Sequence, residues 1–145
     1  MRITVSTTTA APPAEVWEAL ADIASHVDWM LDAESITFEG DQRHGVGTAF
    51  ACLTRVGPLT LRDRMVVTRW DEGRSIGVQH EGAVSGEGVF ELRPYGTGSE
   101  VSWTESLTFP GRLGGRYAAA AARPILTRIW RGNLRRLSQQ TGTIT

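Results

Sequence analysis

Two residues in the second half of the chain have side chains suited to acid–base chemistry and lie in predicted strands: Glu105 and His80. Glu105 falls in residues 98–109, where alternate positions are apolar, so its carboxylate shares the apolar face. Burying a carboxylate there is costly unless it is paired or near water. Glu105 is therefore a strand residue near the mouth of a cavity, or half of an ion pair with an arginine such as Arg69. Alternatively, it is a hydrogen-bond acceptor or general base for a ligand.

His80 ends a predicted strand at residues 74–81. Its imidazole titrates near neutral pH and suits proton transfer, although a histidine beside a turn is also commonly a plain surface residue. His26 and His44 lie in polar segments, and we expect both to face solvent. Glu105 and His80 are the candidate catalytic residues, and the sequence supports no firmer catalytic assignment.

The turns on either side of residues 84–94 predict how these strands pair. If EGAVS closes one hairpin, His80 lies opposite Gly86; if PYGTG closes the next, Glu105 lies opposite Gly88. The two side chains would then be two strands apart, roughly 10 Å across the sheet. We expect them to reach one ligand or a bridging water without touching each other.

Strand parity also predicts which side chains line the inner face of the sheet. In residues 59–70, Met65 and Val67 place Asp63 and Arg69 on their side and Trp70 on the other. The predicted ligand-binding residues are Trp29, Phe50, Cys52, Met65, Arg69, Val78, His80, Phe90, Trp103 and Glu105.

Residues that commonly hold metals or cofactors show no suitable pattern. The three histidines lack H-x-x-x-H or comparable spacing, so we predict no metal site. Cys52 is the one cysteine and has no histidine near it in sequence, which favours a small buried apolar residue over a nucleophile. No strand-to-helix glycine loop for phosphate is present, and we predict no cofactor.

Two tryptophans near the start differ in their expected roles. Trp17 follows Val16 and precedes Leu20 on the apolar face of a first helix, so we expect it to be a packing residue. Trp29 ends a second short helix. Its expected role follows from the family resemblance described below.

Length and composition bound the class of protein. The chain has 145 residues and 41% hydrophobic residues, which predicts one domain at 1–141 with a short tail at 142–145. No apolar leader or long apolar stretch is present, so we expect a cytoplasmic protein without an integral membrane segment. All fifteen basic residues are arginine, which is consistent with a GC-rich, bacterial genome.

Charge is unevenly distributed. Residues 106–145 contain seven arginines and no acid, whereas residues 1–105 contain eight arginines and sixteen acids. The arginines could bind nucleic acid or anionic lipid. We favour a solvated helix face and no nucleic-acid partner, because the domain is not basic overall and aromatic residues are not interleaved on that face.

The order of elements defines an α+β fold. We expect strands at 2–9, 33–39, 47–56, 59–70, 74–81, 84–94 and 98–109, two short helices between the first two strands, and a last helix reaching about residue 140. Consecutive strands with short connections imply an antiparallel meander. The last helix has one apolar face, ending at Leu137, and is the element large enough to cover the sheet.

This order, with VWEALADIASHVDW, RMVVTRWDEGRSIGV and FELRPYGTGSEVSWTESLTFPG in sequence, resembles the START/Bet v 1-like (SRPBCC) superfamily. Within it the chain looks most like the polyketide cyclase/dehydrase-type branch. The resemblance implies a helix-grip fold: a curved seven-stranded antiparallel sheet, β-α-α-β6-α in order, wrapped round a long C-terminal helix. It also implies a cavity for an apolar or aromatic small molecule. The entrance of that cavity would lie at Trp29, whose amphipathic ring suits such a rim, with the indole N–H toward water.

Three functions are compatible with this resemblance, because the fold alone does not choose one. The first is binding of a lipid- or polyketide-like small molecule between the sheet and the last helix. The second is a polyketide cyclase or dehydratase in which Glu105 and His80 transfer protons. The third is a protein-interaction or assembly module. The inner face has few polar groups, which favours the first, and the sequence identifies neither the ligand nor the oligomeric state.

Overall fold

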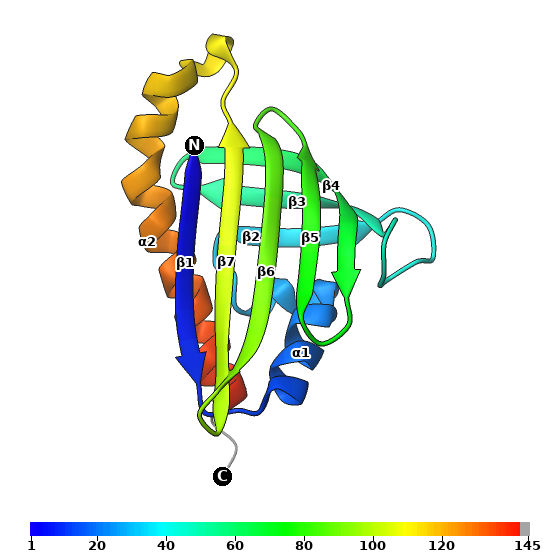
Figure 1. The fold of residues 1–145 in the computed structure, drawn as a ribbon. Coiled ribbons are helices and arrows are strands. Elements are labelled where there is room, and N and C mark those ends of the chain that lie inside the picture. Colours follow the sequence, from blue (N-terminus) through cyan, green and yellow to red (C-terminus); the bar gives the residue numbers. More distant parts are fainter. Residues whose placement is uncertain (143–145) are drawn as a thin grey trace.

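One antiparallel sheet curves beside a long helix in this computed structural model, which describes residues 1–142 (Figure 1). The elements in chain order are β1 (Arg2–Thr9), α1 (Pro13–Ala21), the 3-10 helix η1 (Ile23–Asp28), β2 (Ala33–Phe38), β3 (Ala49–Val56), β4 (Leu59–Asp71), β5 (Ser75–Glu81), β6 (Ser85–Tyr95), β7 (Gly98–Thr108), the 3-10 helix η2 (Gly111–Leu113) and α2 (Gly115–Gly142). The predicted helix-grip fold is confirmed. Of the predicted tail at 142–145, Gly142 ends α2 and the other three residues lie outside the described part.

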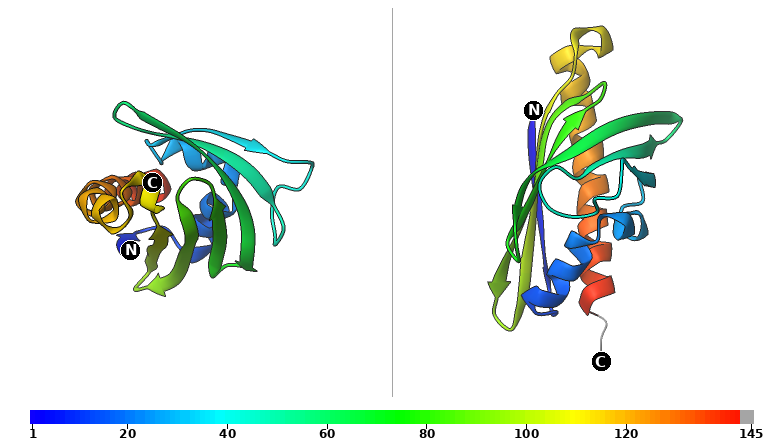
Figure 2. Two further views of the ribbon diagram at one scale, coloured as in Figure 1. Left: turned by 90° about the horizontal axis from the view of Figure 1, so that it is seen from above. Right: turned by 90° about the vertical axis from the view of Figure 1, so that its right-hand side faces the viewer.

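The strands of residues 1–142 form a seven-stranded sheet in the order β1-β7-β6-β5-β4-β3-β2. Every strand from β2 to β7 pairs with its neighbour in sequence, and β1 pairs with β7 at the opposite edge. Seen from above, the sheet bends from β1, beside α2, round to β2 and β3 (Figure 2). Its concave side therefore faces the helices, and its convex side faces solvent.

The hairpin turns give the predicted register. Gly96 closes the β6–β7 hairpin with φ 59°, a left-handed conformation that glycine adopts at little cost. The resulting pairing puts Glu105 opposite Gly88. The preceding hairpin puts His80 opposite Gly86. Both predictions of register are confirmed.

A β-bulge in β4 changes the faces of two residues. The pairing with β5 shifts between Val67 and Arg69, so that Arg69 lies opposite Gly77 and Trp70 lies opposite the buried Ile76. One extra residue reverses the alternation beyond it. The prediction that Arg69 shares the inner face is therefore wrong: it is exposed on the convex side, and the half-buried Trp70 packs against the core instead.

The long helix α2 packs chiefly against β1, and its two halves differ in burial. Trp130, Leu134 and Leu137 in the second half are buried against the sheet and α1. Residues 115–129 contain no fully buried side chain, although Leu126 and Ile129 contact the core. The helix thus anchors the lower end of the molecule in Figure 1 and covers the upper end more loosely.

Candidate functional site

Three charged side chains from three strands form a hydrogen-bonded chain on the concave face. His80 of β5 lies between Asp63 of β4 and Glu105 of β7. Its Nδ1 is 2.8 Å from Asp63 Oδ2, and its Nε2 is 2.8 Å from Glu105 Oε2. Trp103 Nε1 donates to the other oxygen of Glu105, Oε1, at 2.9 Å. We refer to Asp63, His80 and Glu105 as the charged cluster.

Glycines on the intervening strand allow His80 and Glu105 to meet. Glu105 lies across Gly88, where a Cβ would collide with its carboxylate. The expectation that the two side chains could not touch is wrong, because it used the spacing of the backbones alone. With no side chain on β6 at positions 86 and 88, both groups extend over that strand and close the gap.

The cluster is buried. His80 is 9% exposed and Glu105 is 5% exposed, while the Asp63 side chain is 18% exposed. Burial by itself disfavours the charged imidazole. The hydrogen bonds and negative charges of the two carboxylates outweigh burial and raise the pKa of His80 from 6.5 to about 10. His80 is thus an imidazolium at neutral pH and donates one hydrogen bond to each carboxylate.

This arrangement has more acceptors than donors. Both N–H groups of His80 are used within the cluster, which carries two carboxylates and one imidazolium. Asp63 Oδ1 is buried and accepts no hydrogen bond from residues 1–142. Chemically, the cluster can accept hydrogen bonds from a bound molecule and repels an added anion.

The cluster is poorly arranged to hold a metal ion. Its two carboxylates bond to opposite ring nitrogens of His80 and so cannot converge on one point with it. Within the described residues, no group of three or more His, Cys, Asp or Glu side chains could hold a metal ion.

The predicted lining residues, apart from Arg69, lie on the concave side or in the core beneath it. Phe50, Phe90 and Trp103 are buried, and Met65 and Val78 are half-buried. Cys52 is buried with its Sγ 3.8 Å from Thr54 Oγ1. Burial raises the pKa of the Cys52 thiol, so the residue packs as a small apolar side chain and is not an activated nucleophile.

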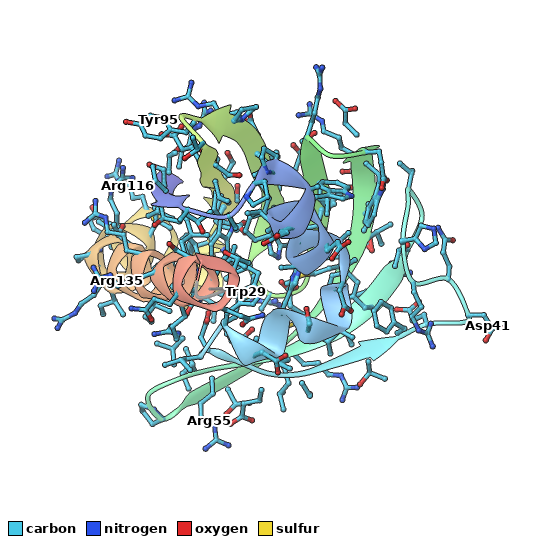
Figure 3. The ribbon with its side chains drawn as sticks, turned by 90° about the horizontal axis from the view of Figure 1, so that it is seen from below. Trp29, Asp41, Arg55, Tyr95, Arg116 and Arg135 are labelled. Atoms are coloured by element: carbon cyan, nitrogen blue, oxygen red, sulfur yellow. The ribbon has the colours of Figure 1, made fainter. Side chains whose placement is uncertain are left out.

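Trp29 is a core residue, and its predicted place at a rim with the N–H toward water is wrong. Its side chain is 0% exposed, and its Nε1 is buried without a partner among residues 1–142. Figure 3 shows it between α2 and the N-terminal helices. Its ring contacts Phe90 and Trp103 at centroid distances of 5.8 and 6.4 Å. The sequence pattern of a short helix end could not show that α2 closes over it.

Trp17 is buried as predicted, and it also makes a polar contact. It is 8% exposed, and its Nε1 donates to Glu72 Oε1 at 2.9 Å. The ring of Trp70 meets it edge-on at 5.5 Å and donates to the other oxygen of Glu72. These contacts join α1 to the β4–β5 turn and are far from the charged cluster in the sheet register.

The two remaining histidines differ in their exposure to solvent. His44 is exposed as predicted. His26 is buried at 7% exposure, contrary to prediction, with its Nε2 2.8 Å from the carbonyl oxygen of Leu20. Burial lowers the pKa of His26 to about 4, so it is neutral at physiological pH. It packs on Trp29 and serves the core.

Asp63 is the site residue that sequence reasoning did not select. Its parity with Met65 correctly indicated the concave face, but nothing in the sequence tied it to His80. The link follows from the pairing of β4 with β5, in which Met65 lies opposite His80 and places Asp63 two residues beyond it. A histidine diagonal to a carboxylate across an antiparallel pair would have been the signal.

A sequence model described as "Polyketide cyclase / dehydrase and lipid transport" matches residues 1–141. The chain belongs to this family. The resemblance to the polyketide cyclase/dehydrase-type branch inferred from the sequence is therefore confirmed. Membership supports hydrophobic ligand binding or a cyclase role in general terms. No curated protein matches this chain in sequence.

Solved structures resemble this family member over nearly its whole length. A protein from Thermus thermophilus has a TM-score of 0.82 at 18% identity, with 97% of each chain covered. The Zhui aromatase/cyclase from Streptomyces sp. R1128 has a TM-score of 0.74 at 17% identity, covering 97% of this chain and 93% of that one. Ara h 8.0201 has a TM-score of 0.69 at 13% identity and 97% coverage of both. At these identities the likeness shows the fold alone.

No helix within the described residues is long and apolar enough to cross a membrane.

Proposed function

We propose that this chain binds an apolar, aromatic small molecule in the cytoplasm, on the concave side of the sheet beneath α2. The observation that carries the proposal is the charged cluster, buried on a face that is otherwise apolar. A buried ion triad contributes little to stability compared with apolar residues of the same volume. Its place beside incompletely covered apolar side chains supports a role in recognition.

Several apolar side chains packed against the core have surface left to bury. Met65, opposite His80, is half-buried, as are Val78, Val84, Leu126 and Ile129. They belong to the sheet, to the β5–β6 turn and to the half of α2 that lacks fully buried residues. A ligand that covered them would gain free energy in proportion to the apolar area removed from water.

The polar end of the ligand is a hydrogen-bond donor, such as a phenol or alcohol hydroxyl. Asp63 Oδ1 accepts no hydrogen bond from residues 1–142, while both imidazolium donors of His80 are occupied. Arg69, the one arginine predicted for the inner face, lies on the convex side. A carboxylate ligand would therefore meet two carboxylates without an arginine partner, and a neutral hydroxylated ligand is preferred.

The cyclase alternative gains less support from this geometry. An imidazole whose pKa is raised to about 10 is not available as a base at neutral pH, and both its nitrogens already hold carboxylates. Both oxygens of Glu105 already accept a hydrogen bond, one from Trp103 and one from His80. Binding is thus the function that the cluster supports best.

Native mass spectrometry of the purified protein tests for a co-purifying small molecule, and calorimetry with 2-naphthol and 2-naphthoate tests the preference. We expect 2-naphthol to bind at least tenfold more tightly than its carboxylate counterpart. Glu105→Gln removes one negative charge and keeps a hydrogen-bond acceptor, so it should lower the ratio of the affinity for 2-naphthol to the affinity for 2-naphthoate. Arg69→Gln, on the convex side, is the matched control and should leave it unchanged. Equal affinities for the two compounds, or an unchanged affinity ratio in Glu105→Gln, would show that the charged cluster does not determine which ligand binds.

A further inference from the structure

The side of α2 that faces away from the sheet forms a continuous exposed stripe. We define the outer face of α2 as Tyr117, Ala121, Pro124, Arg128, Arg131 and Arg135, all of which are exposed. At 100° per residue they fall within an arc of about 80°, directly opposite the buried positions of the same helix. The view from above in Figure 2 places α2 at the margin of the molecule, so this face meets no other element.

The outer face is strongly basic and its charges are unpaired. Residues 106–145 contain seven arginines and no acid. Arg128, Arg131 and Arg135 form no salt bridge with any of residues 1–142. In Figure 3, Arg135 and Arg116 project away from the body of the molecule. A row of positive charges without negative partners attracts an anionic surface.

A groove runs along this helix with apolar residues between the arginines. Its volume is about 960 Å³, and Leu31, Pro124 and Ile129 line it together with arginines that include Arg128 and Arg135. It is an open surface groove lined by residues of α2 and by Leu31.

Apolar side chains are also exposed beside the arginines. Tyr117 is 73% exposed, Leu31 is 68% exposed and Ile125 is 54% exposed. The expectation that no aromatic residue is interleaved on this face is wrong, because Tyr117 continues the arginine row. Ile125 follows Pro124 and adds an apolar side chain. Tyr117, Leu31 and Ile125 are therefore exposed to solvent near the arginines.

We propose that the outer face of α2 docks this protein on an anionic membrane surface. Arginines and isolated apolar side chains alternate along one helix, and a lipid headgroup layer accepts both, the former at phosphates and the latter among acyl chains. A protein partner would need a contiguous apolar centre, which single residues separated by arginines do not form. Nucleic acid would use the charges and leave Leu31 and Ile125 exposed.

Docking through this face would lay α2 along the bilayer, with the sheet on the far side of the helix. The half of α2 that carries Tyr117 and Pro124 outside also carries Leu126 toward the core, near the half-buried apolar residues of the concave face. The docking itself does not depend on the proposed ligand preference.

Co-sedimentation with vesicles tests the proposal, comparing phosphatidylcholine alone with phosphatidylcholine containing about 30% phosphatidylglycerol. We expect binding only to the anionic vesicles, weakening as salt rises to about 0.15 M. The variant Arg128→Gln/Arg131→Gln/Arg135→Gln should bind at least tenfold more weakly, since each arginine contributes roughly fivefold near an anionic surface. Tyr117→Ser/Ile125→Ser should also bind more weakly.

The matched control is Arg62→Gln/Arg69→Gln/Arg74→Gln, which makes the same change in net charge at three exposed arginines of the sheet and its turn. It should bind like the unmodified protein, and thermal melts should show that all variants remain folded. An equal loss in both triple variants, unchanged binding of Tyr117→Ser/Ile125→Ser, or binding to heparin or DNA without binding to anionic vesicles overturns the proposal.

Discussion

At the scale of single residues, the stability of the charged cluster depends on His80. Two carboxylates share one buried imidazolium, with both contacts at 2.8 Å. Removing the imidazolium leaves two negative charges buried without a positive partner. The free-energy cost of these unpaired charges exceeds the net stabilisation that the intact cluster provides. The cluster is therefore sensitive to partial removal and tolerant of complete replacement.

We expect His80→Phe to lower the free energy of unfolding by about 3–5 kcal/mol at neutral pH, measured by urea denaturation. The control is a triple variant, Asp63→Asn/His80→Phe/Glu105→Gln, which removes both orphaned charges as well. It should recover much of the loss. If the single variant is as stable as the unmodified protein, the three groups do not form a buried charged cluster in solution.

The pKa of His80 predicts how stability changes with pH. The fold raises this pKa from 6.5 to about 10, so the folded protein holds a proton that the unfolded chain releases between these values. The contribution of His80 is complete below pH 6.5 and is lost as the pH rises through about 10. Unfolding free energies measured between these limits should fall about 1.36 kcal/mol per pH unit more steeply than in His80→Gln. Parallel curves would contradict the shift.

At the scale of elements, glycines on β6 and in the β5–β6 turn provide the space for the cluster. A Cβ at position 88 would overlap the Glu105 carboxylate, and one at position 82 would overlap Asp63. Each carboxylate thus requires a particular glycine on a neighbouring segment. Substituting these glycines changes the cluster without touching its charged residues.

We expect Gly88→Ala to displace Glu105, destabilise the protein by about 1–3 kcal/mol and weaken binding of any ligand at the cluster. Gly111→Ala is the control, because nothing lies within 4 Å of a Cβ there and its φ is not positive. Thermal melts and calorimetry on both variants measure the two effects. If Gly88→Ala behaves like Gly111→Ala, Glu105 does not depend on the space above Gly88.

Much of the element arrangement was predictable, because strand parity and turn residues act over a few positions. The turn at Gly96 correctly placed Glu105 opposite Gly88. The predictions were wrong where contacts between residues far apart in the sequence determine the structure. The bulge beyond Val67 reversed Arg69 and Trp70, and no local signal in the sequence marks it. The His80–Glu105 contact required side chains to cross a strand, which backbone spacing does not describe.

At the scale of the whole molecule, burial is concentrated at one end. The rings of Trp29, Phe90, Trp103 and Trp130 pack together where the second half of α2 meets the sheet. The other end has the charged cluster, half-buried apolar side chains and the loosely packed start of α2. This division predicts that the two ends of the molecule differ in local stability.

Hydrogen exchange should show the same division. Amides of residues 116–128 should exchange faster than those of residues 130–141, although both lie in one continuous helix. The physical reason is that buried side chains stabilise only the second half. Exchange measured by mass spectrometry on overlapping peptides, with β7 as the protected reference, checks this. Uniform protection along α2 would mean that the first half is packed as firmly as the second.

The aromatic packing has an optical consequence. Trp103 donates its indole N–H to Glu105, and its ring lies 5.2 Å from that of Trp130 and 6.4 Å from that of Trp29. Electronic transitions of indoles this close together couple, so their near-ultraviolet circular dichroism is a property of the group and not of one chromophore. A change in charge or hydrogen bonding at Glu105 alters the electronic transitions of Trp103. Because these transitions couple with those of Trp130 and Trp29, the circular dichroism of the whole group changes. The spectrum of the unlabelled protein is therefore a readout of the buried carboxylate.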